Sequence, residues 1–595
     1  MRGADEPPPD PDTPRRGEPP RQPGIQAMNP VPVRAATLLD HLERSRLEFG
    51  SAMEPRKCAL LDALRRLELR TAKQVLRLHD ALCFMRAYPD GPELLKRVER
   101  MLADFPRRRD LARHRRSLAD SGIAGTSIEF RFFWPQARWL AARWGTRLTI
   151  VWRDFEGRDQ LGPLLPLLTH FSETPALDEL AYTPRQWVTR LKGPDDSDAT
   201  FLVRRFAALP MDEFGREKLY DRLDPPLRLA PGPDTPSRTT AGAAPARVVF
   251  QTAPLIRARP DLAAELRRAP LVVRPVSHGE GQRLIDLARA AMVTRSRDLD
   301  VFSWGDPDDV RMADCGGGLQ FAVIGAIPER RLLMEAVYAF LTLKNGVPIG
   351  YVLNSALYGS AEIAYNVFEN WRGAEAGTIY GRVLATVRHL FGADSFTIYP
   401  YQLGDGNPEA LESGAWWFYQ KLGFRPRDPE ARALMELELK RMKTRTSHRS
   451  SMATLKRLAR ANLYYHAGRV RDDVIGLVPL PAAGLAVSAL LATRFGSDRE
   501  RGARVCADEA ARLLGAPSRR RWNEGERLAW DRWSPLVLVL PGVANWTTGE
   551  KRALIEVVKA KGGRRESEFV RRFDRHRRLR EALRKLALRE DAANP

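Results

Sequence analysis

The stretch Gly414–Pro426, GAWWFYQKLGFRP, carries the strongest structural signal in the chain. Three aromatic residues are followed by Tyr419, and a lysine and a leucine then lead into Gly423-Phe424. Such a run of aromatic side chains predicts a helix packed into a core, and the glycine predicts that the helix ends there. Two interpretations of Tyr419 remain: its ring only fills the core, or its hydroxyl also takes part in chemistry.

The residues before this stretch alternate between strand and helix signals. Asn345-Gly346 is the preferred pair for a two-residue turn and predicts a β-hairpin. Hydrophobic periodicity predicts strands at 271–276, 321–324, 336–343, 348–353, 361–369 and 395–401, and helices at 278–292, 377–391 and 408–422. This order predicts an α/β (α+β) domain built on a mixed sheet.

Three segments of this region resemble the GNAT superfamily, whose members transfer an acyl group from coenzyme A to an amine. Val272-Val-Arg-Pro275 resembles the opening strand of the family, and Trp371-Arg-Gly373 resembles the start of its pyrophosphate loop. Ala415–Phe424 resembles its closing motif, an alanine, a tyrosine four residues on and then Lys-Leu-Gly-Phe. The resemblance covers about 270–427 and implies a GNAT-like mixed sheet that binds acetyl-CoA, or another acyl-CoA, and acetylates an amine whose identity is unknown.

The resemblance also implies a set of site residues. The start of the helix near 377 would hold the pyrophosphate, because free backbone N–H groups and the positive end of the helix dipole favour an anion. Tyr419 would give a proton to the departing thiolate, for which a phenol is a suitable acid. The implied coenzyme-binding residues are Val367 in the strand backbone, the loop and helix residues Arg372, Gly373, Ala374, Ala376, Gly377 and Gly381, and Asn407.

The sequence departs from the family pattern in two places. Glu375 stands where the loop pattern has glycine, and a carboxylate there would repel a pyrophosphate by about one to a few kcal/mol. A second register, in which the helix starts near Gly381 and the loop is four residues longer, stays open. Glu412 stands where the family usually has asparagine, and Asn407 is an alternative for that role.

The general base has two candidates, Glu362 and Glu369, which flank the strand that would bind the substrate. Side chains alternate between the two faces of a strand, so these two glutamates are expected on opposite faces. At most one of them can then face a given cleft. No metal ligand is predicted.

At 595 residues, the chain is expected to hold two to four domains. Composition and periodicity predict a disordered Pro-rich tail at 1–30, a mainly helical domain at 31–224, a linker at 225–246, the acyltransferase-like domain at 247–430, and a helical, basic domain at 431–595. The flanking helical domains would select the acceptor.

The formal net charge of +22 favours an anionic partner. Nucleic acid or an acidic protein could bind the basic helices, of which the region 561–590 is the most basic. An equally good explanation is that the protein is generally rich in arginine, and that these arginines lie on solvent-exposed helix faces without binding a partner. A non-catalytic scaffold that keeps the fold and binds such a partner is therefore the second functional hypothesis.

The four cysteines are far apart and form no CxxC or Cys/His pair, which predicts neither a disulfide framework nor a zinc site. A reducing, cytoplasmic location is expected. Residues 474–493 carry no charge, but Pro479, Pro481 and Gly484 interrupt them. A buried helix after a proline turn is therefore expected there rather than a membrane span.

Overall fold

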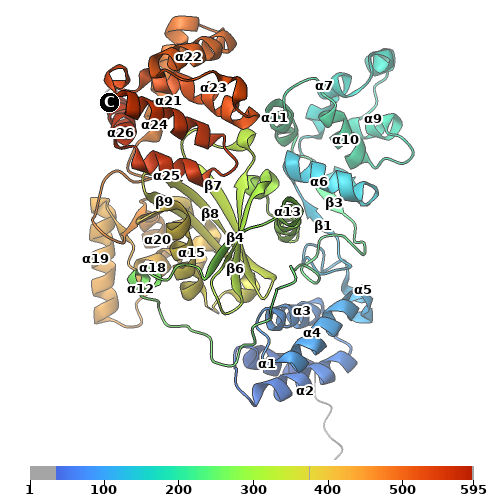
Figure 1. Ribbon diagram of the computed structural model, residues 1–595. Coiled ribbons are helices and arrows are strands. Elements are labelled where there is room, and N and C mark those ends of the chain that lie inside the picture. Colours follow the sequence, from blue (N-terminus) through green and yellow to red (C-terminus); the bar gives the residue numbers. More distant parts are fainter. Residues whose placement is uncertain (1–34, 374, 592–595) are drawn as a thin grey trace, which may run out of the picture.

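The computed structural model describes residues 35–373 and 375–591 (Figure 1). The tail expected at 1–30 and the predicted site residue Ala374 lie outside these residues. The chain is a mixed α/β protein in which a nine-stranded sheet forms the centre and helices surround it.

The N-terminal part is a helical bundle, drawn in blue at the lower right of Figure 1. Its helices are α1 (Ala35–Ser45), α2 (Met53–Arg66), α3 (Ala72–Ala87), α4 (Pro92–Asp104) and α5 (Arg109–His114). One face of α3 is buried almost completely, including His79, Cys83 and Phe84.

Residues 128–229 carry a small sheet of their own, with the strand order β1-β3-β2. The third strand lies inside the segment that composition predicts to be a linker, and the buried Leu227 and Leu229 bring it into this core. The elements are β1 (Ile128–Phe130), α6 (Trp134–Trp144), β2 (Leu148–Ile150), α7 (Arg158–Leu168), α8 (Thr174–Glu179), α9 (Pro184–Leu191), α10 (Asp198–Ala207), α11 (Glu213–Leu223) and β3 (Leu227–Leu229).

The central sheet has the strand order β11-β12-β10-β9-β8-β7-β6-β5-β4. The hairpin predicted at Asn345-Gly346 is confirmed, since β7 and β8 pair antiparallel around it. The strands are β4 (Val272–Pro275), β5 (Gly305–Asp314), β6 (Leu319–Ala326), β7 (Ala336–Lys344), β8 (Val347–Leu357), β9 (Ser360–Val367), β10 (Ser395–Ile398), β11 (Arg425–Pro426) and β12 (Leu463–His466). Sequence periodicity missed β5, because the acidic, proline-containing start of this strand has the composition of a loop. It also missed β12, which lies in the region after residue 430 that was expected to be helical.

Only one neighbouring pair in this sheet, β9 and β10, is parallel. A parallel pair needs a crossover connection, which α15 (Ala376–Phe391) supplies. The two strands pair only between 360–362 and 395–397. From Ile363 to Val367, β9 pairs with β8 alone, so the sheet divides there.

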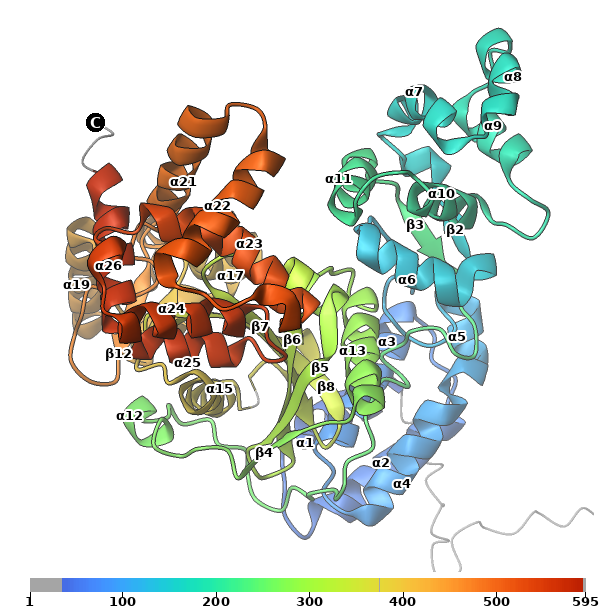
Figure 2. The ribbon, with the colours of Figure 1, turned by 45° about the horizontal axis from the view of Figure 1, so that its top comes forward.

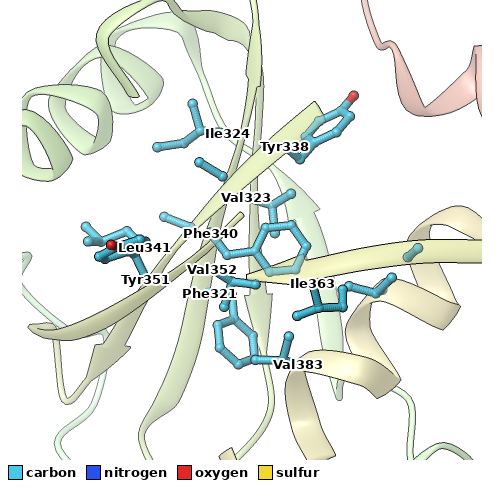
Figure 3. Close-up of a cluster of buried hydrophobic side chains, with 14 of the residues drawn as sticks. Phe321, Val323, Ile324, Tyr338, Phe340, Leu341, Tyr351, Val352, Ile363 and Val383 are labelled. Carbon is cyan, nitrogen blue, oxygen red and sulfur yellow. The ribbon is translucent and has the colours of Figure 1, made fainter. Parts of the chain in front are cut away.

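The two faces of the sheet bury different side chains, and Figure 3 shows both sets. On the α15 face, Phe321, Phe340 and Ile363 lie near Val383 of α15. On the opposite face, the α13 face, Ile324 packs near Ile285 of α13 (His278–Val293). Tyr351 lies on the α13 face, and strand register puts Asn366 and Glu362 on this face as well. The short helix α14 (Asp300–Ser303) packs beside α13, whereas the short helix α12 (Leu262–Glu265) packs against α15.

The helix expected at 408–422 is divided into α17 (Pro408–Ser413) and α18 (Ala415–Lys421). Gly414 separates them with a left-handed φ of 69°, which glycine adopts without strain. The strand expected to reach Tyr401 ends at Ile398, because Pro400 begins the short helix α16 (Pro400–Leu403). After the breaks at Pro400 and Gly414, α18 lies beside the division in the sheet.

The C-terminal part is helical apart from β12. Its helices are α19 (Pro429–Thr444), α20 (Met452–Leu458), α21 (Leu480–Phe495), α22 (Arg499–Leu514), α23 (Glu524–Val539), α24 (Thr548–Lys561), α25 (Ser567–Arg575) and α26 (Arg577–Asp591). Most of α21 is exposed or half-buried rather than buried as expected, and Figure 2 shows α21 and α22 projecting from the rest. Among the described residues no single helix is long and apolar enough to cross a membrane, although α21 and α22, which meet at 105°, pass the same criteria as a bent pair.

Buried polar contacts hold α25 on the α15 face of the sheet. Tyr338 donates to Asp309 at 2.5 Å, and the backbone N–H of Ser567 donates to the Tyr338 hydroxyl at 2.8 Å. Lys561 forms a 2.5 Å ion pair with Glu566, and both side chains are almost fully buried. Lys561 Nζ also donates to the carbonyl of Glu335 just before β7 at 2.9 Å, so this ion pair links the helices to the sheet.

Replacing Lys561 with methionine should destabilise the protein by about 3–5 kcal/mol, because Glu566 would stay buried without a countercharge. The free energy of unfolding from urea denaturation measures the effect. The control is Lys559→Met, since Lys559 makes only partly exposed ion pairs and its loss should cost less than about 1 kcal/mol. Equal losses for the two variants would contradict the structural role of Lys561.

Candidate functional site

A pocket of about 250 Å³ lies where β9 and β10 separate. Its walls come from the free end of β9, from the loop that leads into α15, and from the helices α17 and α18. The lining residues are Tyr365, Asn366, Val367, Arg372, Gly373, Ala376, Gln402, Asn407, Glu409, Ala410, Ser413, Ala415, Phe418 and Tyr419.

The backbone of β9 offers hydrogen-bonding groups to this pocket. The N–H of Phe368, just after β9, donates to the carbonyl of Ile349 in β8. In an antiparallel pair, every second residue directs both its N–H and its C=O toward the partner strand, so Phe368 and every second residue before it face β8. Tyr365 and Val367 are the intervening residues, and their N–H and C=O groups are directed toward the gap. The carbonyl of Val367 accepts from Arg372 Nε at 3.2 Å, while the amide of Val367 stays available to a ligand.

The N-terminus of α15 closes one end of the pocket. Its N-cap residue, Glu375, makes no side-chain capping bond in the described part of the chain, which leaves the N–H groups of the first turn to other acceptors. The Tyr365 hydroxyl donates to the carbonyl of Ala376 at 3.1 Å and fixes this turn against β9. Backbone donors and the positive end of the helix dipole therefore lie beside Arg372.

Glu375 does not line the pocket, although its carboxylate was expected to repel a pyrophosphate there. It lies 3.3 Å from Lys344 at the end of β7, and both side chains are largely buried. The Lys344 ammonium balances the charge of Glu375 and holds its side chain away from the pocket. No local sequence pattern indicates this pair, because 31 residues separate the partners.

Arg372 and Arg297 converge on one carboxylate at the pocket wall. Arg372 Nη2 donates to Glu409, and Arg297 Nη2 donates to the second oxygen of the same group at 3.3 Å. Arg297 also donates to the Tyr351 hydroxyl at 3.0 Å, which holds it beside the sheet. Neither Arg297 nor Glu409 was predicted, because a contact between distant segments leaves no local sequence pattern.

Tyr419 lines the pocket and is only 3% exposed. Its ring packs against Tyr380 and Phe424 at centroid distances of 5.5 and 5.9 Å. The described residues provide no hydrogen-bond partner for its hydroxyl. Burial raises the pKa of Tyr419, so the hydroxyl keeps its proton at neutral pH and can act as a donor.

The two tryptophans of the same helix point elsewhere. Trp416 Nε1 donates to the carbonyl of Leu458 at 3.1 Å, and Trp417 Nε1 donates to Ser450 Oγ at 3.1 Å. Neither lines the pocket. The aromatic stretch therefore packs its tryptophans against the segment 450–458 and directs Phe418 and Tyr419 to the pocket.

The two predicted bases have different surroundings. Glu362 is half-buried on the α13 face, next to the division in the sheet and outside the pocket lining. Burial and the neighbouring charge of Glu335 raise the pKa of Glu362 to about 7, a value suited to a base at neutral pH. Glu369 is exposed on the 3-10 turn η6 (Glu369–Trp371) beyond the end of β9, so strand alternation does not govern its direction.

Five of the predicted coenzyme-binding residues line the pocket: Val367, Arg372, Gly373, Ala376 and Asn407. Asn407 also caps α17, where its Oδ1 accepts from the N–H of Ala410 at 3.2 Å. Gly377 and Gly381 instead face the segment before β4, where an added Cβ would lie 3.1 Å from Pro260 and 2.9 Å from Glu265. The structure thus starts the helix at Ala376, and Gly381 lies within it.

Replacing Glu409 with glutamine should strengthen the binding of inorganic pyrophosphate about fivefold, because it removes the anion that Arg372 and Arg297 share, an effect of about 1 kcal/mol. Isothermal titration calorimetry at low ionic strength measures the affinity. Glu412→Gln is the matched control, since Glu412 is exposed on the same helix and does not line the pocket. Unchanged or weaker binding by the Glu409 variant would contradict an anion site at these arginines.

No family model matches this chain, and neither a curated protein nor a solved structure matches it significantly. The geometry and chemistry of the pocket are therefore the basis for its function.

Proposed function

We propose that this chain is an acyl-CoA-dependent N-acyltransferase of the GNAT type, with the donor held in the pocket between β9 and α18. The observation that carries the proposal is the pocket itself, which joins unpaired β9 amides, the N-terminus of α15 and the hydroxyl of Tyr419. An acyl-CoA needs these three features: hydrogen bonds along an extended chain, a donor set for phosphate, and an acid near the sulfur.

Charge at the pocket supports the same donor. Arg372 and the first turn of α15 provide the positive end, and Lys344 neutralises Glu375. The scaffold hypothesis has less support, because a gap filled by Trp416, Trp417 or Phe368 would favour it and none of these residues lines the pocket.

The roles of the pocket residues follow from their positions, and that of Glu362 follows from its raised pKa and its place beside the division in the sheet. The thioester supplies the carbonyl carbon that the amine attacks, and the Val367 amide stabilises the oxygen on which charge develops. Glu362 accepts the proton that the attacking amine loses. Tyr419 donates its proton to the sulfur as the carbon–sulfur bond breaks, which leaves an amide and a free thiol.

The full-length chain should bind acetyl-CoA with a measurable heat in calorimetry, and Tyr419→Phe should keep that affinity within about threefold. The same variant should lower kcat about 100-fold, because the leaving thiolate loses its proton donor. Steady-state kinetics with a panel of amines measures this effect.

Tyr380→Phe is the matched control for Tyr419→Phe. Its hydroxyl is buried in the same aromatic cluster, finds no partner among the described residues and does not reach the pocket, so turnover should not change. The absence of acetyl-CoA binding at millimolar concentration would refute the proposed function, and equal turnover in the two variants would remove Tyr419 from the mechanism.

For the wild-type protein, kcat/KM should rise with pH through about 7 and then level off, because only deprotonated Glu362 can accept a proton. Glu362→Gln should abolish this rise. Glu335→Gln should keep the rise but move it to lower pH, since the charge of Glu335 helps to raise the pKa of Glu362. A rise that persists in the Glu362 variant would assign the base to another group.

A further inference from the structure

The pocket loop, which the structure describes at residues 369–373 and 375, lies between β9 and α15 and contacts the N-terminal bundle at its first turn. Asn370 in η6 donates from Nδ2 to Asp80 Oδ1 on α3 at 3.0 Å. This bond joins positions 290 residues apart in the chain.

Asp80 is held firmly in place. Arg238 Nη2 donates to it at 2.7 Å, and Arg238 Nη1 donates to the carbonyl of Ser121 at 3.1 Å. Burial disfavours ionisation of Asp80, but His79 and Arg238 outweigh that effect and hold its pKa below the ordinary value. Asp80 therefore presents a fixed, charged acceptor to Asn370.

The other end of the loop is held by a second buried contact. Glu375 pairs with Lys344 at 3.3 Å, and the Lys344 ammonium lies 4.6 Å from the ring centre of Tyr88, the residue that follows α3. Next to Lys344, Asn345 Nδ2 donates to the carbonyl of Ala87 at 2.9 Å. The tip of the β7–β8 hairpin thus joins the C-terminus of α3 to the start of α15.

Both contacts lead to the same helix. Asn370 bonds directly to the middle of α3, and Glu375 reaches the end of α3 through Lys344. Arg372 and Gly373, which line the pocket, lie between these two points. A loop of this length would otherwise sample many conformations, and ordering its residues costs conformational entropy. The contacts with α3 offset part of that cost before any ligand binds.

We infer that the N-terminal helical bundle is an integral part of the donor site: Asn370 and Glu375 are positioning residues through which α3 holds the pocket loop in the conformation that binds phosphate. The inference rests on the donor role proposed above for the pocket. Glu375, which stands where the family pattern has glycine, would then position the loop instead of weakening the binding of the donor. A loosened loop should weaken donor binding without slowing the chemical step, because Tyr419 and Glu362 lie on other elements.

Asn370→Asp tests the first contact by placing a second carboxylate against Asp80, which repels the loop from α3. Hydrogen exchange of the amides in 369–377 should become at least tenfold faster, while amides of β7 keep the wild-type rate. Trypsin should cleave faster after Arg372. In kinetics, KM for acetyl-CoA should rise about tenfold, and kcat should stay within about twofold of the wild-type value.

The double variant Lys344→Met, Glu375→Gln tests the second contact, because it removes both charges at once and leaves no buried ion without a partner. The same faster exchange is expected.

Asn370→Ala, which removes the hydrogen bond without adding a charge, gives a milder version of the first test. Asp104→Asn is the control, since Asp104 is exposed at the end of α4 and, among the described residues, pairs only with Arg107.

Wild-type exchange rates in the loop of both Asn370 variants and of the double variant would overturn the inference, even if the protein binds acetyl-CoA. Faster exchange with a raised kcat/KM would also overturn it. Exchange reports on the loop without any ligand, so wild-type protein that fails to bind acetyl-CoA would refute the proposed donor separately.

Discussion

The short pairing between β9 and β10 is the constraint on which the rest of the structure depends. β8 holds β9 along its whole length, but β10 holds it over three residues only. Backbone amides that lose their sheet partner need another acceptor or water, so the unpaired end of β9 is suited to bind an extended ligand. The crossover that the parallel pair requires places the N-terminus of α15 at the same opening.

The aromatic stretch serves both packing and the pocket. Successive residues of a helix point about 100° apart, so the four aromatic residues of α18 cannot share one environment. Trp416 and Trp417 donate to residues in the segment 450–458, while Phe418 and Tyr419 face the pocket. The Tyr419 ring is packed in an aromatic cluster that holds its hydroxyl in one place. Packing and chemistry are thus compatible roles for this residue.

The flanking domains are built into the central sheet by buried polar contacts. Lys561 and Glu566 link the C-terminal helices to β7, and Asp80 links α3 to the pocket loop. Many arginines are used in the same way: Arg571, for example, donates to the carbonyls of Leu390 and His389 at the end of α15. The large positive charge is therefore partly structural, since it satisfies carbonyls and carboxylates inside the protein.

Local patterns in the sequence determined the elements, because periodicity and turn residues act over a few positions. They predicted the hairpin at Asn345-Gly346 and the helix at α15, whereas the positions Val367, Arg372 and Tyr419, which line the pocket, were implied only by the family resemblance. They missed β5, whose acidic start has the composition of a loop, and the break at Gly414. Only the tertiary structure decided the partners of Glu375, the convergence of Arg297 and Arg372 on Glu409, and the surroundings of Glu362. These depend on contacts between segments far apart in the chain, which no local pattern encodes.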